Sequence, residues 1–252
     1  MSVEKAEIEC RFRRSVDSYE ENAHVQKKIV MHLVELLKCY CPVEQNRILE
    51  VGCGTGLLTE QLKCRWNYKE LWLNDLVDAM CIKAAGRCGI EARYCLPGDI
   101  EKLPLAGMFS LVVSTSTFQW LEHPSETFGH LARHIVPGGY LVFSSFGKDN
   151  CRELKAITGN GLTYHSLAET EEILSGYFEV VHAEEELYTL DFNYPLDILQ
   201  HIKKTGVNAM SSHKTWTRAS LDAFAQEYAV RFLKDGRYPL TYHPQYFICR
   251  KS

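Results

Sequence analysis

The 252-residue sequence lacks the features that mark membrane, secreted and nucleic-acid-binding proteins. No run of apolar residues reaches the roughly 18 that a transmembrane helix needs, so no membrane partner is expected. The first residues, MSVEKAEIECRFRR, contain no apolar segment of the kind found in signal peptides, which predicts a cytoplasmic location. Because 28 Lys and Arg residues face 32 Asp and Glu residues, the net charge is −4. This balance provides no basic field for a nucleic acid, which is therefore not expected as a partner.

The ten cysteines follow neither a disulfide nor a metal-binding pattern. No Cys-x-x-Cys pair is present, and the two closest cysteines are Cys39 and Cys41. Zinc sites usually take their ligands as closely spaced pairs, so no metal is expected. Ten cysteines in 252 residues also fall well below the ~8–10% typical of a disulfide scaffold. We therefore expect reduced thiols that are mostly packed in the core.

Short apolar strands alternate with helical patterns over more than half of the sequence. A helical stretch at residues 4–41, in two pieces, ends at Pro42. The alternation predicts an α/β fold in which helices cover both faces of a parallel sheet. Strands are predicted at 47–51, 70–74, 92–95, 109–114 and 140–144, and helices at 57–63, 77–85 and 125–135, with a turn at 136–139.

The carboxyl-terminal part follows a different pattern. Residues 178–192 are predicted to form one long or two short strands, residues 195–233 are predicted to be helical, and residues 242–250 form a last strand. We therefore expect a single domain with four parts. These are an amino-terminal helical cap (1–45), a ligand-binding core (46–192), a helical insertion or lid (193–235) and a final strand segment (236–252).

A glycine-rich turn directly follows the first predicted strand. Gly52, Gly54 and Gly56 alternate with other residues, so a ligand can approach the backbone where a Cβ would collide. In an open α/β sheet, this position lies at the carboxyl ends of the strands, where ligands bind. A dinucleotide fingerprint would need glycine at position 57, which is Leu57, and no Lys-Ser/Thr follows as in a P-loop.

Acidic residues end the next two predicted strands. Asp75 follows the glycine turn by about 20 residues, the spacing at which a carboxylate accepts ribose hydroxyls. Asp99 and Ile100 follow the third strand, where a carboxylate and an apolar side chain can flank a purine. Both aspartates also suit helix or turn caps, so that alternative stays open.

This arrangement resembles the class I S-adenosylmethionine-dependent methyltransferases over about residues 45–145. Residues 50–56 are similar to their first motif, Asp75 to their ribose-binding acid, and Asp99-Ile100 to their adenine motif. The resemblance implies a Rossmann-like doubly wound sheet of order 3-2-1-4-5-7-6 with strand 7 antiparallel, and S-adenosyl-L-methionine as cofactor. The cofactor-binding residues that it implies are Tyr19, Glu50, Gly52, Cys53, Gly54, Gly56, Asp75, Leu76, Asp99, Ile100 and Ser114.

Beyond the core, the sequence resembles one family, the malonyl-[acyl-carrier protein] O-methyltransferases of biotin synthesis. Similar segments lie at 12–26, 99–104, 117–120, 202–206 and 236–243. The resemblance implies methylation of the free carboxylate of a malonyl thioester, carried by acyl carrier protein or by coenzyme A. A carboxylate with a reference pKa near ~4 is ionised at pH 7, so no general base is required.

The substrate side is expected to use hydroxyl, indole, amide and modest cationic contacts. A tight arginine clamp would stabilise the anionic ground state more than the less charged transition state. The candidate catalytic residues are Tyr19, Gln119, Trp120, Arg237, Tyr242 and His243. A local docking patch for an acidic carrier is predicted from Arg11, Arg13, Arg14, Lys148 and Arg152.

Three alternatives remain at this stage. The first is a methyltransferase that acts on another small carboxylate or small molecule. The second is a non-catalytic module that binds S-adenosylmethionine. The third, a nicotinamide oxidoreductase, is disfavoured by Leu57.

Overall fold

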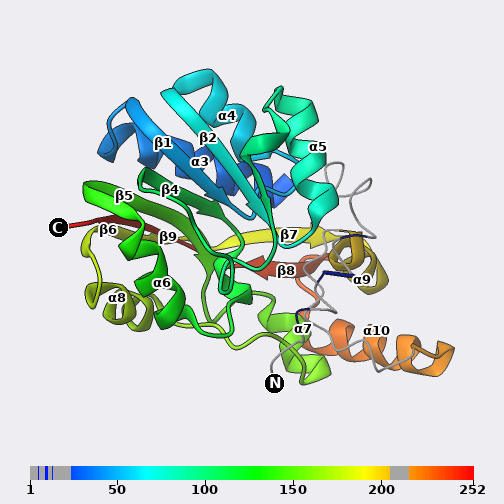
Figure 1. The fold of residues 1–252 in the computed structure, drawn as a ribbon. Helices are drawn as coiled ribbons and strands as arrows, with labels where there is room; N and C mark the ends of the chain where they lie inside the picture. The colour runs from blue at the N-terminus through cyan, green and yellow to red at the C-terminus, as the bar shows by residue number, and fades with distance from the viewer. Residues whose placement is uncertain (1–4, 6–8, 11–12, 14–23, 205–215) are drawn as a thin grey trace.

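A seven-stranded sheet forms the centre of the molecule (Figure 1). The computed structural model describes residues 5, 9–10, 13, 24–204 and 216–252. Parallel pairing joins the first five strands, and the strand at the carboxyl terminus is inserted antiparallel between two others. In sheet order the strands are β3 (Cys95–Pro97), β2 (Asn67–Asp75), β1 (Glu44–Val51), β4 (Phe109–Thr115), β5 (Ile135–Phe146), β9 (Pro244–Arg250) and β6 (Glu179–Glu185).

The central strands are apolar because both faces of the sheet are covered. Ile48 and Val113 belong to one core, whereas Leu49 and Val112, their neighbours in sequence, belong to the other. All four side chains are fully buried. This alternation within a continuous apolar run is what a parallel sheet between two helical layers requires.

Helices separated in sequence cover the two faces. One face carries α3 (His24–Tyr40), α4 (Leu57–Arg65) and α5 (Asp78–Cys88), and the other carries α6 (Pro124–Arg133) and α8 (Leu167–Ser175) (Figure 1). Ile29 and Leu33 of α3 and Leu58 of α4 pack into the first core, and Phe128 and Leu174 pack into the second. The predicted doubly wound sheet and its strand order are therefore confirmed, with β9 as the antiparallel seventh strand.

Several predicted boundaries were wrong. Of the predicted third strand, 92–95, the first three residues form a short 3-10 helix, η1 (Ala92–Tyr94), and the strand begins only at Cys95. The turn predicted at 136–139 lies inside β5, which pairs irregularly with β4 there. The last predicted strand, 242–250, is interrupted at His243. For residues 178–192 the two-strand alternative is confirmed, and β6 and β7 (Tyr188–Phe192) belong to different sheets.

A second, two-stranded sheet lies beside the main one. It pairs β7 with β8 (Tyr238–Tyr242), while α9 (Pro195–Lys204) packs on β7, and α10 (Arg218–Phe232) packs on α7 (Arg152–Thr158), α9 and β8. The expected division into cap, core, insertion and final segment stays a prediction. Within the described ranges, no helix combines the length and apolarity needed to span a bilayer.

Candidate active site

The first cavity opens at the carboxyl ends of the parallel strands. It encloses about 830 Å³ and is open to solvent. Its lining comes from the segments that follow β1, β2, β3 and β4, together with one amino-terminal residue: Lys5, Val51, Gly52, Gly54, Asn74, Asp75, Leu76, Val77, Met80, Gly98, Asp99, Ile100, Thr115, Ser116, Thr117, Trp120 and Leu121.

The three glycines of the turn have different roles. All have positive φ, at 70° for Gly52, 52° for Gly54 and 91° for Gly56. A Cβ on Gly52 would lie 2.0 Å from the Thr117 hydroxyl oxygen, whereas one on Gly54 would meet nothing within 4 Å. Gly56 instead begins α4 against α5, where a Cβ would lie 3.2 Å from the Ala84 Cα. Gly52 therefore permits the close approach of Thr117, Gly54 keeps the cavity wall open, and Gly56 permits close helix packing.

Asp75 links the glycine turn to the end of β2. Its two carboxylate oxygens accept the backbone N–H groups of Gly54 at 2.8 Å and Val77 at 2.9 Å. Burial raises the pKa of Asp75 to about 6, although both backbone donors act in the opposite direction. A partly protonated carboxyl near neutral pH therefore lines the cavity at the point predicted for a ribose.

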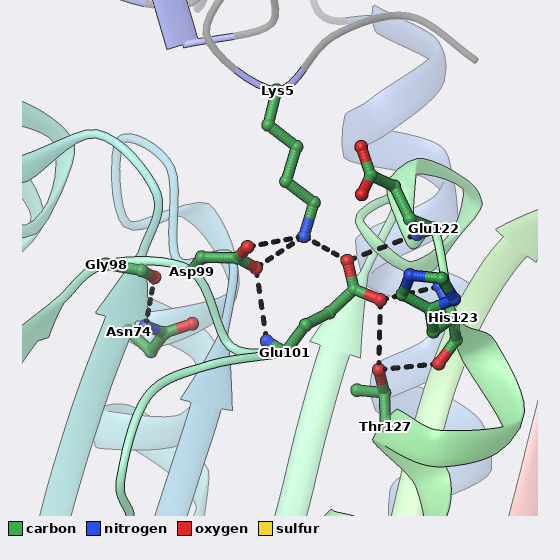
Figure 2. A network of polar contacts seen from close by, with 8 residues as sticks. All are labelled: Lys5, Asn74, Gly98, Asp99, Glu101, Glu122, His123 and Thr127. Atoms are coloured by element: carbon green, nitrogen blue, oxygen red, sulfur yellow. Dashed lines mark hydrogen bonds and ion pairs between the residues drawn. The ribbon is translucent and has the colours of Figure 1, made fainter.

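Asp99 lies at another wall, held by charges and backbone groups (Figure 2). Lys5 donates to both of its oxygens at 2.6 Å, and the Glu101 N–H donates to one of them at 3.1 Å. Ile100, which is buried, and Leu76 add apolar surface to the same cavity. The structure thus brings together the predicted ribose acid, the predicted adenine motif and the glycine turn.

Four predicted cofactor residues lie behind the cavity wall rather than in it. Glu50 accepts the Thr59 hydroxyl at 2.7 Å, and burial raises the pKa of Glu50 to about 8. The Ser114 hydroxyl donates to the Val51 carbonyl at 2.8 Å. Cys53 is buried with its sulfur 4.0 Å from that of Cys81, and Gly56 lies in the packing of α4 on α5. These residues shape the loop, and their direct contact with a cofactor stays a prediction.

A second cavity of about 600 Å³ adjoins the first. The short helix η2 (Phe118–Trp120) separates them, since Trp120 lines the first cavity, Gln119 lines the second, and the next residue, Leu121, lines both. The second cavity combines aromatic walls with hydroxyl, amide and imidazole groups. Its lining is Phe118, Gln119, Leu121, Glu122, Pro124, Phe128, Phe143, Ser145, Phe146, Thr163, Tyr164, His165, Thr170 and Ile173.

The remaining predicted substrate residues are not gathered in these cavities. Arg237 donates to Asn193 in an exposed turn before β8. Tyr242 is fully buried, with its hydroxyl 2.8 Å from the His201 ring. His243 accepts the Asp149 N–H at 3.1 Å and pairs with Glu185 at 3.2 Å. Their side chains line neither cavity, and Tyr19 lies outside the described residues.

Sequence reasoning missed several residues that line the first cavity. Ser116 has a φ of 52°, a strained backbone conformation for a residue other than glycine, and strain of this kind often marks functional sites. Its N–H donates to the Ser144 carbonyl oxygen at 3.1 Å. The Asn74 amide donates to the carbonyls of Leu96 and Gly98, which fixes the loop before Asp99. No sequence pattern marked Lys5 as a site residue, because its partners lie more than 90 residues away in sequence.

Comparison with known proteins points to one family. Residues 49–143 match the model described as a methyltransferase domain. A malonyl-[acyl-carrier protein] O-methyltransferase from Acinetobacter baylyi is 36% identical over 100% of this chain and 99% of its own. One from Bacteroides thetaiotaomicron is 34% identical over 99% of each chain.

Solved structures agree on the fold at much lower identity. The N-methyltransferase NodS from Bradyrhizobium japonicum, in complex with S-adenosyl-L-homocysteine, matches with a TM-score of 0.59 at 16% identity, covering 97% of this chain and 98% of its own. A Haemonchus contortus phosphoethanolamine N-methyltransferase matches with a TM-score of 0.55 at 16% identity, covering 88% and 52%. Since the full-length relatives exceed 30% identity, this chain belongs to the malonyl-[acyl-carrier protein] O-methyltransferase family.

Proposed function

We propose that the protein transfers a methyl group from S-adenosyl-L-methionine to the free carboxylate of malonyl-[acyl-carrier protein], an early step of biotin synthesis. The observation that carries this proposal is the similarity to relatives of that name along the whole chain, the predicted insertion and tail included. Methylation removes the negative charge of the malonyl group. The resulting ester then resembles the apolar chains that fatty-acid elongation enzymes accept.

The first cavity fits the cofactor. Gly54 offers an open side where a Cβ would protrude, and Asp75 and Asp99 place carboxylate acceptors at two separate walls. Asp75 would accept ribose hydroxyls, and Asp99 with Ile100 would hold the adenine. When bound, S-adenosyl-L-methionine supplies an electrophilic methyl group on a positively charged sulfur. The carboxylates around the cavity also favour a cationic ligand.

The second cavity is the place that we assign to the malonyl group. Hydroxyl groups at Ser145 and Thr163 are neutral donors for a carboxylate, and the Gln119 amide nitrogen, which also donates to the Ser116 carbonyl oxygen at 2.5 Å, would offer its remaining N–H. No lysine or arginine is among the described residues that line it, so the anionic ground state is not held too tightly. The aromatic walls exclude water from the reacting carboxylate, whose own negative charge makes a protein base unnecessary.

The chain's main contribution to rate is then alignment. Leu121 lines both cavities, so the cofactor and the malonyl group would meet beside this residue, with Trp120 on the cofactor side. Fixing two reactants in line can lower a barrier by roughly 7–11 kcal/mol in well-aligned cases. No proton has to move for the carboxylate to react, so Gln119 and its neighbours act as positioning groups for it.

The carrier is proposed to dock through local positive charge. On the surface, Arg13 pairs with Asp78, Lys148 with Glu169 and Arg152 with Asp149, and Arg152 also contacts the buried carboxylate of Glu153. Arg11 and Arg14 lie outside the described residues. Malonyl-coenzyme A is a further proposed substrate, because it presents the same carboxylate. The ten free cysteines fit the proposed cytoplasmic location.

Transfer of a labelled methyl group tests the proposal directly. The purified protein is incubated with labelled cofactor and malonyl-, succinyl- or acetyl-[acyl-carrier protein], and with malonyl-coenzyme A. A base-labile methyl ester on malonyl thioesters, with no transfer to the acetyl thioester, is expected. Transfer to an unrelated small carboxylate alone, or cofactor binding without any transfer, would contradict it. Rescue of a biotin-requiring strain that lacks this step tests the pathway.

A further inference from the structure

Lys5 brings a positive charge to the wall of the first cavity. Its ammonium group lies 2.6 Å from both oxygens of Asp99 and also contacts a carboxylate oxygen of Glu101 (Figure 2). The side chains of Lys5 and Asp99 are each 17% exposed, and that of Glu101 is 6% exposed. Among the described residues that line this cavity, Lys5 is the one lysine or arginine.

Glu101 connects Lys5 to the segment that follows the partition between the two cavities. Its carboxylate accepts the backbone N–H groups of Glu122 at 3.1 Å and His123 at 2.7 Å, and lies 3.3 Å from the Thr127 hydroxyl. Glu122 directly follows Leu121, which lines both cavities, and Thr127 belongs to α6. One ammonium group therefore joins the Asp99 loop to the segment that ends the partition.

The two carboxylates need this cation. Both lie within hydrogen-bond distance of the same nitrogen, so they are close to each other and poorly hydrated. Burial opposes the charge of Glu101, but the hydrogen bonds from Lys5 and from two backbone N–H groups lower the pKa of that carboxyl. Burial likewise opposes the charge of Lys5, and the hydrogen bonds to Asp99 and Glu101 raise its pKa. Without the ammonium group, two neighbouring anions would repel at the cavity wall.

Lys5 leaves Asp99 able to bind a further donor. A carboxylate offers about four lone-pair sites, and Lys5 and the Glu101 N–H take three of them. One acceptor direction remains for an amino group such as that of adenine. The contact is therefore compatible with an occupied cavity and does not block it.

We propose that Lys5 is a positioning residue for the cofactor, since its ammonium group fixes the Asp99 carboxylate against the adenine and ties that wall to Glu101. This inference rests on the assignment of Asp99 to the adenine in the proposed function. It gives a part in cofactor binding to Lys5, a residue that belongs to none of the motifs found in the sequence. Its effect is expected on the dissociation rate of the cofactor, because the contact holds the wall in place after binding.

Binding of S-adenosyl-L-homocysteine to the full-length protein tests the inference. Lys5→Met, which keeps the length of the side chain, is expected to raise Kd about 10-fold, mostly through faster dissociation. Lys5→Arg is expected to recover most of the affinity. Lys38→Met is the matched control: Lys38 pairs with Glu35 on the exposed face of α3 and lines neither cavity, so little change is expected. Kd for Lys5→Met within twofold of the unmutated protein, or tighter binding, would overturn the inference.

A double-mutant cycle separates positioning from general loosening. Glu101→Gln should also weaken binding, and the double variant should bind no more weakly than the weaker single variant, because both changes break one contact. Fully additive losses of binding free energy would show that Lys5 and Glu101 do not act through one contact. Denaturant unfolding of the same variants without ligand gives the coupling between Lys5 and Glu101 in the free energy of unfolding, which does not depend on the cofactor.

These readouts also distinguish the inference from the proposed function. If the unmutated protein binds S-adenosyl-L-homocysteine but methylates no malonyl thioester, the substrate proposal fails while the Lys5 comparison still stands. If methylation proceeds and Lys5→Met binds normally, only the Lys5 inference fails. If the unmutated protein does not bind the probe, both the cofactor assignment and the inference are refuted.

Discussion

The two cavities differ in how their residues are distributed along the chain. Apart from Lys5, the first is lined by residues between Val51 and Leu121, each close to the carboxyl end of a parallel strand. The second takes residues from η2, α6, the end of β5 and the segment before and within α8. The first therefore gathers residues near the ends of parallel strands, where a local sequence pattern marks them, whereas the second gathers side chains of 118–128, 143–146 and 163–173, which no such pattern marks. A general cofactor suits the first arrangement, and a specific acceptor suits the second.

The largest expected effect is on cofactor binding and comes from Gly54, which lines the first cavity but not the second. In Gly54→Val, a branched side chain would occupy a φ of 52° and project into the open space of the first cavity. We expect S-adenosyl-L-homocysteine binding to weaken by about 100-fold or more in calorimetry, because strain and obstruction add.

Gly86→Ala is the matched control for Gly54→Val. Gly86 lies within α5, has no heavy atom within 4 Å of an added Cβ, and lines neither cavity. Its binding should be unchanged and its unfolding free energy should rise by about 0.5–1 kcal/mol. Normal cofactor binding by Gly54→Val would show that the turn does not approach the ligand.

Asp75→Asn should weaken cofactor binding by about 10- to 100-fold, since a charged acceptor of two hydroxyl groups is replaced by a neutral amide. The KM for malonyl-[acyl-carrier protein] at saturating cofactor should stay within about twofold, because Asp75 does not line the second cavity. Glu91→Gln, in an exposed pair with Arg93, serves as the control. An unchanged Kd for Asp75→Asn would refute the ribose assignment.

Cofactor binding in the first cavity should depend on pH between pH 5 and pH 7, whereas the charge of the malonyl group proposed for the second cavity should not. With a pKa of about 6, Asp75 is mostly ionised at pH 7 and mostly protonated at pH 5. If ribose hydroxyls donate to the ionised form, Kd for S-adenosyl-L-homocysteine rises about 10-fold between pH 7 and pH 5. The malonyl carboxylate, with a reference pKa near ~4, stays largely ionised in that range. The Asp75→Asn variant should show a flat profile, and a sloping one would assign the effect to another group.

The Asp75 carboxyl also affects stability: as the pH rises, it should strengthen cofactor binding but lower the free energy of unfolding. Because its folded-state pKa lies above its ordinary value of 3.8, the protonated form is favoured by folding. Its contribution to the free energy of unfolding is present at low pH and is lost as the pH rises through about 6. Comparison of denaturant midpoints for the unmutated protein and Asp75→Asn between pH 4 and pH 7 measures this contribution.

The smallest expected effect concerns the second cavity. Gln119→Leu keeps the approximate size of the side chain but removes its amide from the cavity. We expect the KM for malonyl-[acyl-carrier protein] to rise about 5-fold, with cofactor Kd unchanged. Gln226→Leu, on the exposed face of α10, is the control. A change in cofactor Kd with no change in KM would place Gln119 on the other side of the partition.

Local patterns predicted one cavity better than the other. Gly54, Asp75 and Asp99 were predicted because each follows an apolar strand at a spacing that a parallel sheet brings to one edge. Arg237, Tyr242 and His243 were predicted from resemblance alone, and the structure puts their side chains in a surface turn and in the core. Ser145 and Thr163 were not predicted, since nothing local marks a hydroxyl that lines a cavity built by other segments.

By itself, the sequence determined the doubly wound sheet and the glycine-rich loop at the first cavity, because apolar periodicity, glycine spacing and strand-end acids are local properties. The strand order followed from the family resemblance. Only the tertiary structure decided that η2 divides two cavities and that Lys5 meets Asp99 and Glu101 across more than 90 residues. The physical reason is that contacts between distant segments depend on packing and charge compensation, which leave no periodic signal along the chain.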